Sequence, residues 1–154
     1  MKEKNVKIKN RQHIDNAMKN GKGMILLTAH IGNWELGGMI LSMLGYPIVA
    51  IALPHQERIV NDLFNEQRGS KGIEVIQSNV AVRKCIEVLR ENKIIALLPD
   101  RDFSLNGEIM NFLGKRTFIP KGPAAFCIKT GAPIVPTFFM REDDDTFTLT
   151  FYEP

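Results

Sequence analysis

The side chains best suited to chemistry gather in one short segment, HIGNWE, which runs from His30 to Glu35. It follows the apolar run 24–29 and leads into a second apolar stretch, so it lies where a buried strand gives way to a helix. On one continuous helix, five residues turn through roughly 500°, and the two side chains would diverge. If His30 lies in the turn and Glu35 in the first helical turn, the carboxylate can hold the imidazole in one tautomer, as in a Ser-His-Asp triad.

Two neighbours suit such a turn. Gly32 tolerates backbone angles that other residues avoid, and Asn33 is a favourable N-cap for the helix that follows. A purely structural interpretation stays open beside the catalytic one. A Glu in the first turn of a helix is favoured by the helix dipole alone, and a His near a strand end is often only a hydrogen-bonded loop residue.

Hydrophobic periodicity predicts an alternation of strands and helices along the 154 residues. Strands are expected at 24–29, 48–52, 75–76, 94–98, 134–140 and 146–152, and helices at 11–19, 34–44, 58–68, 81–90 and 122–130. Such alternation indicates an α/β fold with a mostly parallel central sheet flanked by helices. The acidic stretch 142–145 predicts an antiparallel edge hairpin at the C-terminus, and 99–121 is expected to be a long loop, a kind of connection that is often functional.

In an open parallel sheet, ligands bind beyond the carboxyl ends of the strands. His30 and Glu35 follow the first strand of the set above, and Asp100 and Arg101 follow the fourth, so we expect both pairs at one edge. His13, on an early helix, and His55, just past the second strand, are weaker candidates for site residues.

Composition indicates one domain over residues 1–154, with 44% hydrophobic and 24% charged residues. A net charge of +3 is too small to argue for nucleic acid. The longest apolar runs are about six residues, far short of the ~20 that span a bilayer. Cys85 and Cys127 fall in apolar helical segments and read as buried thiols, and no spacing suggests a metal site.

The first ten residues are polar and basic. Lys2, Lys4, Lys7 and Lys9 could contact anionic lipid, at about 1 kcal/mol for each residue near the surface. Phe103 and Phe112 could add apolar contact at the rim of the site. The alternative is that the basic segment is a solvated tail.

Embedded as LLTAHIGNWELGG, the His-x4-Glu pattern resembles the first motif of the bacterial lipid A acyltransferases, the lauroyl and myristoyl transferases. These belong to the wider lysophospholipid and glycerol-phosphate acyltransferase superfamily. Later segments resemble the family's further blocks in order: Arg68 with 72–76, 95–102 with Gly107 and 111–114, 122–125, and 130–136. Typical members are about twice as long and begin with a hydrophobic helix, so the chain is expected to be either the catalytic core of a longer protein or a minimal, truncated member of the family.

The resemblance implies an acyltransferase that moves a fatty acyl group from acyl-carrier protein or acyl-CoA to a hydroxyl of a glycolipid or lysophospholipid, without a cofactor. It implies peripheral attachment at the cytoplasmic face of the inner membrane. His30 would be the general base, a role typically worth 10²–10⁴-fold, and Glu35 would orient it. A guanidinium could meet the oxyanion or hold phosphate. The expected substrate-binding residues are Asn33, Arg68, Asp100 and Arg101.

Other interpretations stay open. Arg68 could be a helix C-terminal cation, and Arg101 could simply pair with Asp102. The strand 94–98 followed by Asp100 and Asp102 resembles the nucleophile loop of haloacid-dehalogenase-type phosphatases, in which magnesium bridges two carboxylates. A non-catalytic lipid- or partner-binding domain of the same fold is the third possibility.

Overall fold

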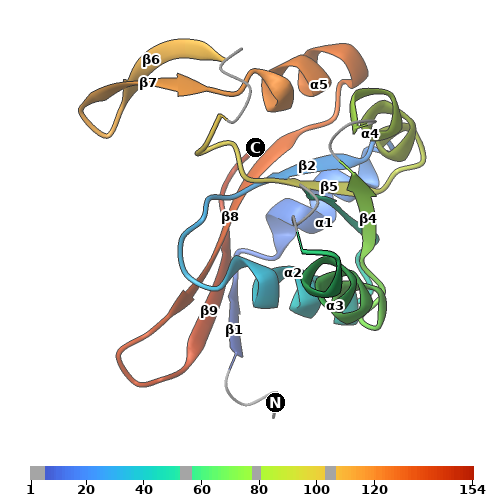
Figure 1. Ribbon diagram of the computed structural model, residues 1–154, viewed down its shortest axis with the longest axis vertical. Coiled ribbons are helices and arrows are strands. Elements are labelled where there is room, and N and C mark those ends of the chain that lie inside the picture. Colours follow the sequence, from blue (N-terminus) through green and yellow to red (C-terminus); the bar gives the residue numbers. More distant parts are fainter. Residues whose placement is uncertain (1–5, 53–56, 78–80, 103–106) are drawn as a thin grey trace.

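The structure, a computed structural model, describes residues 6–52, 57–77, 81–102 and 107–154. Its large sheet has the strand order β1-β9-β8-β2-β5-β3-β4, with helices on both faces (Figure 1). The strands of this sheet are β1 Val6–Lys9, β2 Met24–Leu27, β3 Ile48–Ala52, β4 Glu74–Gln77, β5 Ile94–Leu97, β8 Ile134–Arg141 and β9 Phe147–Phe151. The helices are α1 Gln12–Lys19, α2 Trp34–Met43, α3 Arg58–Gly69, α4 Ala81–Arg90 and α5 Gly122–Thr130.

Parallel pairing organises the centre of the sheet. Strand β2 pairs with both β5 and β8, and β3 pairs with both β5 and β4, all in parallel. The sequences MILL in β2 and IIAL in β5 contain no polar residue, as expected for strands that are covered on both faces. The α/β fold with a mostly parallel sheet is therefore confirmed, as is the antiparallel pairing of β8 with β9.

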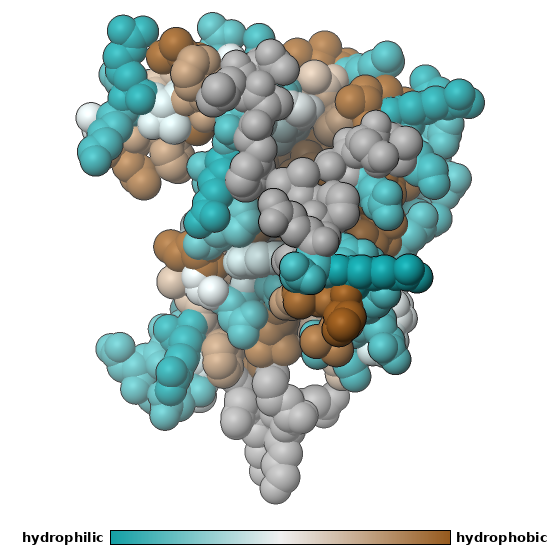
Figure 2. Space-filling model, in the orientation of Figure 1, coloured by the Kyte–Doolittle hydropathy of each residue, from teal (hydrophilic) through white to brown (hydrophobic). Residues whose placement is uncertain are grey.

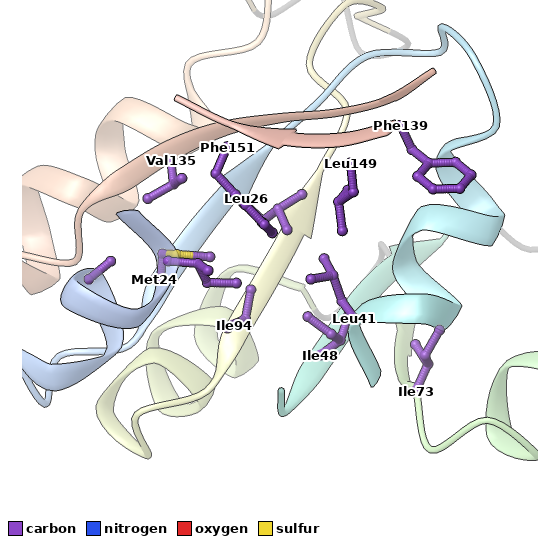
Figure 3. Packing of buried hydrophobic residues seen from close by; sticks show 12 residues of the cluster. Met24, Leu26, Leu41, Ile48, Ile73, Ile94, Val135, Phe139, Leu149 and Phe151 are labelled. Atoms are coloured by element: carbon purple, nitrogen blue, oxygen red, sulfur yellow. The ribbon is translucent and has the colours of Figure 1, made fainter. Parts of the chain in front are cut away.

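Two apolar layers cover the two faces of this sheet. One layer joins Leu26, Ile48 and Leu149 to residues of α1 and α2, and its packing is drawn in Figure 3. The other layer packs the opposite-facing residues of the same strands against α4 and α5, with Leu89 and Phe126 among the buried side chains. The alternation of side chains along each strand divides the apolar residues between the two layers.

The N-terminal segment differs from the expectation. Val6–Lys9 is a strand that pairs in parallel with β9, so the C-terminal hairpin is not at the edge of the sheet. The side chains of Val6 and Ile8 pack against the core, and Lys7 forms an ion pair with Asp144 at 3.6 Å. A solvated tail is therefore wrong for residues 6–9. Lys2 and Lys4 lie outside the described residues.

The expected loop 99–121 contains a second element that was not predicted. Strands β6 Glu108–Phe112 and β7 Lys115–Ile119 form an antiparallel hairpin separate from the large sheet. Every residue of β6 is exposed, so no buried face gives this strand the apolar alternation by which strands are recognised.

Candidate active site

His30 and Asp100 meet at one edge of the sheet. Strands β2 and β5 pair in parallel with Leu27 opposite Leu97, so their carboxyl ends lie together, and each of the two residues follows one of these ends. The Asp100 carboxylate receives two hydrogen bonds from His30. The backbone N–H of His30 donates to Oδ2 at 3.0 Å, and the ring Nδ1 lies 2.8 Å from Oδ1.

The turn that carries His30 is held against β8. Gly32 has a φ of 65°, and a Cβ there would come within 2.1 Å of the Phe139 carbonyl oxygen. The N–H of Asn33 donates to the same oxygen at 3.1 Å. The Asn33 side chain accepts from the N–H of Leu36 at 3.1 Å, which confirms it as the N-cap of α2. These contacts keep His30 outside the helix, as the spacing of the segment predicts.

Burial by itself would raise the pKa of Asp100. The hydrogen bonds from the backbone and ring of His30, together with the charge of the imidazolium, outweigh burial and hold the pKa of Asp100 below its ordinary value. Asp100 is therefore ionised near neutral pH, and an ionised carboxylate can only accept hydrogen bonds. When the imidazole is neutral, its Nδ1 must then carry the proton, and Nε2 is left as the basic nitrogen of the ring.

Glu35 does not take the orienting position that the sequence predicts. Its carboxylate binds Arg68 instead, with both Nη2 and Nε donating to it, the latter at 3.2 Å. The Arg68 guanidinium also lies over the ring of Phe64, 5.6 Å from its centroid. Since Arg68 is buried and Glu35 mostly so, this is a largely enclosed ion pair beside His30. The spacing of five residues predicts Glu35 as the carboxylate that holds the His30 ring, but in the structure that carboxylate is Asp100.

A cavity of about 410 Å³ opens at this site. His30, Trp34 and Arg101 contribute to its lining, and the Trp34 ring stands edge-on to the imidazole at 5.4 Å between centroids. The remainder of the lining is mostly apolar and comes from the sheet and α2, including Leu26, Leu41, Ile48, Ala50, Ile51, Ile73, Ala96, Leu97, Phe139 and Leu149. A polar edge joined to an apolar interior suits a ligand with a reactive head and a hydrocarbon body.

Small residues create the space for this cavity. A Cβ on Gly37 would lie 2.9 Å from the Phe139 Cβ, so the glycine lets α2 approach β8 closely. Ala50 and Ala96 are register partners on β3 and β5, and both line the cavity. Larger side chains at these two positions would occupy its interior.

Comparison with known proteins identifies the family of this chain. The sequence matches the bacterial lipid A biosynthesis acyltransferase family over residues 1–154. The chain belongs to this family. Membership confirms the resemblance carried by the HIGNWE segment and the blocks that follow it.

The phosphatidylinositol mannoside acyltransferase of Mycobacterium tuberculosis (strain ATCC 25618 / H37Rv) is 33% identical over 129 residues, which cover 81% of this chain and 41% of that protein. Its counterpart in Mycolicibacterium smegmatis is 33% identical over 136 residues, 86% of this chain and 45% of that protein. The lipid A biosynthesis acyltransferase of Haemophilus influenzae is 24% identical over 128 residues, 82% and 40% of the two chains. The chain thus spans less than half the length of these relatives.

Two further residues predicted to bind substrate in this lipid A acyltransferase family member differ in their relation to the cavity. Arg101 is exposed and lines the cavity, whereas Asn33 caps α2 and is not among the cavity-lining residues. Their roles in substrate binding stay predictions. His13 lies on α1, half-buried, and His55 and Phe103 lie outside the described residues.

The sequence also predicts buried cysteines and no membrane-spanning segment in this family member. Cys85 is buried, and burial raises the pKa of its thiol to about 11, which fits a structural cysteine. Within the described residues, no helix is both long and apolar enough to cross a bilayer.

Proposed function

We propose that this chain transfers a fatty acyl group from an acyl thioester to a hydroxyl of a glycolipid. The observation that carries this proposal is the His30–Asp100 pair at the edge of an apolar cavity. A general base beside a space for hydrocarbon is what such a reaction requires. The names of the relatives, which are acyltransferases of glycolipid pathways, support the same class of reaction.

In the proposed reaction, Nε2 of His30 removes the proton of the acceptor hydroxyl. The hydroxyl oxygen attacks the thioester carbonyl, and a tetrahedral intermediate with an oxyanion forms. The C–S bond then breaks, the imidazolium returns the proton to the departing sulfur, and the products are an ester and a free thiol. Asp100 stabilises the imidazolium while it exists, and no protein nucleophile is needed because the donor is already activated.

Arg101 is the better candidate of the two predicted cations for the oxyanion or for a substrate phosphate. It is exposed at the cavity and forms no ion pair within the described residues. The Arg68 guanidinium is engaged by Glu35 and stacks over Phe64. We infer that the Glu35–Arg68 pair shapes the cavity wall. The exposed guanidinium of Arg101 then stabilises the negative charge of the oxyanion or the substrate phosphate.

The donor and the place of action belong to the same proposal. Acyl-carrier protein or acyl-CoA would supply the thioester, and the acceptor would be a glycolipid or a lysophospholipid. Such an acceptor requires the protein to work at a membrane surface, which we propose is the cytoplasmic face of the inner membrane.

The phosphatase alternative is disfavoured by the partners of its two carboxylates. Asp100 is hydrogen-bonded to His30, and Asp102 accepts a hydrogen bond from the N–H of Gly107 at 2.6 Å. A nucleophilic aspartate needs a free carboxylate facing its substrate. A non-catalytic lipid-binding domain would share the cavity but would have no use for an oriented base.

The test is the rate of acyl transfer, followed as thiol release and as ester formed, for wild type, His30→Ala and the control His13→Ala. We expect His30→Ala to lose about 10²–10⁴-fold in turnover and to stay folded, with a melting temperature lowered only by the loss of the ring hydrogen bond to Asp100. The control should keep its turnover. Near wild-type turnover by folded His30→Ala would contradict the role of the base. Wild-type protein that binds acyl chains without turning over any thioester would favour the binding domain.

A further inference from the structure

The hairpin of β6 and β7 exposes large apolar residues on both of its faces and at its turn. In Figure 1 it extends beyond the large sheet, and in Figure 2 the same projection carries hydrophobic and hydrophilic atoms side by side. The exposed large apolar residues on this hairpin are Ile109, Met110, Phe112, Leu113 and Phe118. Ile109 and Phe118 are register partners and lie on one face of the hairpin, whereas Met110 and Phe112 lie on the other face. Phe112 and Leu113 are the large apolar residues at the tip, and it is there that an interaction surface is argued.

The turn of the hairpin is the most unusual part of it. Leu113 has a φ of 51° and Gly114 a φ of 79°, the backbone signature of a two-residue turn that favours Asn-Gly. Leucine is a poor choice for a left-handed backbone, and here it is 89% exposed. Neither the backbone conformation nor burial in this chain accounts for a leucine at the turn.

Charge around the turn points to the partner. Lys115 and Arg116 follow Gly114 directly, both are exposed, and neither forms an ion pair in the part of the chain that the structure describes. The acidic residue of the hairpin, Glu108, lies at the opposite end of β6 and pairs with Lys121 at 3.5 Å. The turn therefore combines apolar side chains with unpaired positive charge, the pattern of elements that bind anionic interfaces.

The base of the hairpin is hydrogen-bonded to the segment after β5, which also carries Asp100. The N–H of Gly107 donates to Asp102, which lies two positions after Asp100. A Cβ on Gly107 would come within 2.5 Å of the Ile119 carbonyl oxygen, so the two ends of the hairpin are in close contact there. Strands of five residues extend about 17 Å. The turn thus projects from the loop that carries one half of the catalytic pair.

We propose that the hairpin tip, residues 112–116, docks on the anionic surface of a lipid bilayer, with the apolar side chains at the interface and the two cations against headgroups. This inference rests on the proposed function, because an enzyme acting on a glycolipid must meet its acceptor at a membrane. It assigns the contact to a specific element, in addition to any contribution from the basic N-terminal segment.

The test is binding to vesicles, measured by co-sedimentation with neutral phosphatidylcholine and with phosphatidylcholine containing phosphatidylglycerol. One variant is Leu113→Asn, which removes the apolar side chain but suits the left-handed turn, so the melting temperature should not fall. The other is Lys115→Gln with Arg116→Gln. Ile59→Gln, on α3, which lies apart from the hairpin in Figure 1, and Lys84→Gln, on α4, are matched controls, since both side chains are exposed.

We expect the double charge variant to bind anionic vesicles about thirtyfold more weakly, because each basic residue contributes about 1 kcal/mol at an anionic surface. Leu113→Asn should bind several-fold more weakly, and the two controls should bind like wild type. Equal binding by wild type and both hairpin variants would overturn the proposal, as would absent binding by wild type. Self-association that Leu113→Asn abolishes, without vesicle binding, would identify a second copy as the partner and would also overturn it.

Turnover of a water-soluble thioester and acceptor by wild-type protein separates this result from the proposed function. If the protein turns over the thioester but the hairpin variants bind vesicles like wild type, the acyltransferase proposal is supported and the proposal of membrane docking by the hairpin is overturned. Hairpin-dependent vesicle binding without turnover would support the docking surface and contradict the reaction.

Discussion

Asp100 holds His30 through both the backbone and the ring, with the backbone N–H at 3.0 Å from one carboxylate oxygen and Nδ1 at 2.8 Å from the other. The carboxylate therefore fixes the position of the residue as well as the tautomer of its imidazole. Both hydrogen bonds cross from the end of β5 to the end of β2, two strands that are paired in the sheet. The pair is consequently held by two strands that are themselves hydrogen-bonded to each other.

The first prediction concerns acid stability. The pKa of Asp100 is lower in the folded protein than its ordinary value of 3.8, despite burial, because of its hydrogen bonds with His30. A lowered carboxyl pKa stabilises the fold above the ordinary pKa, and this contribution disappears as pH falls through the lowered value. The free energy of unfolding of wild type should exceed that of Asp100→Asn at pH 7, and the difference should shrink below about pH 4. Denaturant unfolding at several pH values measures it.

Asp143→Asn, in the exposed turn between β8 and β9, is the control for this series. It should behave like wild type at every pH. A difference between wild type and Asp100→Asn that stays constant from pH 7 to pH 2 would mean that the charge of Asp100 does not contribute to stability.

The second prediction concerns the turn that carries His30. Gly32→Ala places a Cβ against the Phe139 carbonyl in a left-handed backbone, whereas Gly21→Ala has the same backbone, with a φ of 68°, in open space. Strain alone should cost Gly21→Ala about 1–2 kcal/mol. Gly32→Ala should cost clearly more and should also lower turnover, because His30 must move. Thermal unfolding of both variants tests this, and equal losses would contradict the close contact with β8.

The third prediction concerns the cavity. Ala50→Leu adds bulk between β3 and the other cavity walls, so the preferred acyl donor should become shorter. Ala125→Leu, on the exposed face of α5, is the matched control and should leave the preference unchanged. Rates with a series of saturated acyl thioesters measure the preference. An unchanged optimum for Ala50→Leu would mean that the acyl chain does not enter this cavity.

The fourth prediction separates an enclosed ion pair from an exposed one. Glu35→Gln leaves the buried Arg68 guanidinium without a charged partner and should lower the free energy of unfolding by about 1–3 kcal/mol. Glu87→Gln breaks the exposed pair with Arg83 on α4 and should cost at most about 0.5 kcal/mol. Similar losses for the two variants would show that Glu35 and Arg68 do not form an enclosed pair in solution.

The central strands and most helix limits could be predicted from the sequence because their apolar residues recur with a period that the core imposes. Strand β1 could not, since VKIK is short and its partner β9 lies at the other end of the chain. The β6–β7 hairpin has no buried face and so lacks that signal.

The candidate site was predicted in part for a related reason. The position of His30 and of Asp100 after a strand is visible in the sequence, but their pairing depends on β2 and β5 being neighbours, which local spacing does not encode. The two residues are 70 positions apart in the chain. Proximity in sequence predicts Glu35 as the partner of His30, whereas Glu35 binds Arg68, 33 positions away on α3.

The measurement that tests the central claim most directly is the ring ¹⁵N spectrum of His30 in wild type, Asp100→Asn and Glu35→Gln. With the imidazole neutral, we predict that wild type carries the proton on Nδ1, with Nε2 unprotonated. This tautomer should persist in Glu35→Gln and give way to a mixture in Asp100→Asn. A proton on Nε2 in wild type, or a tautomer that depends on Glu35 and not on Asp100, would contradict the account.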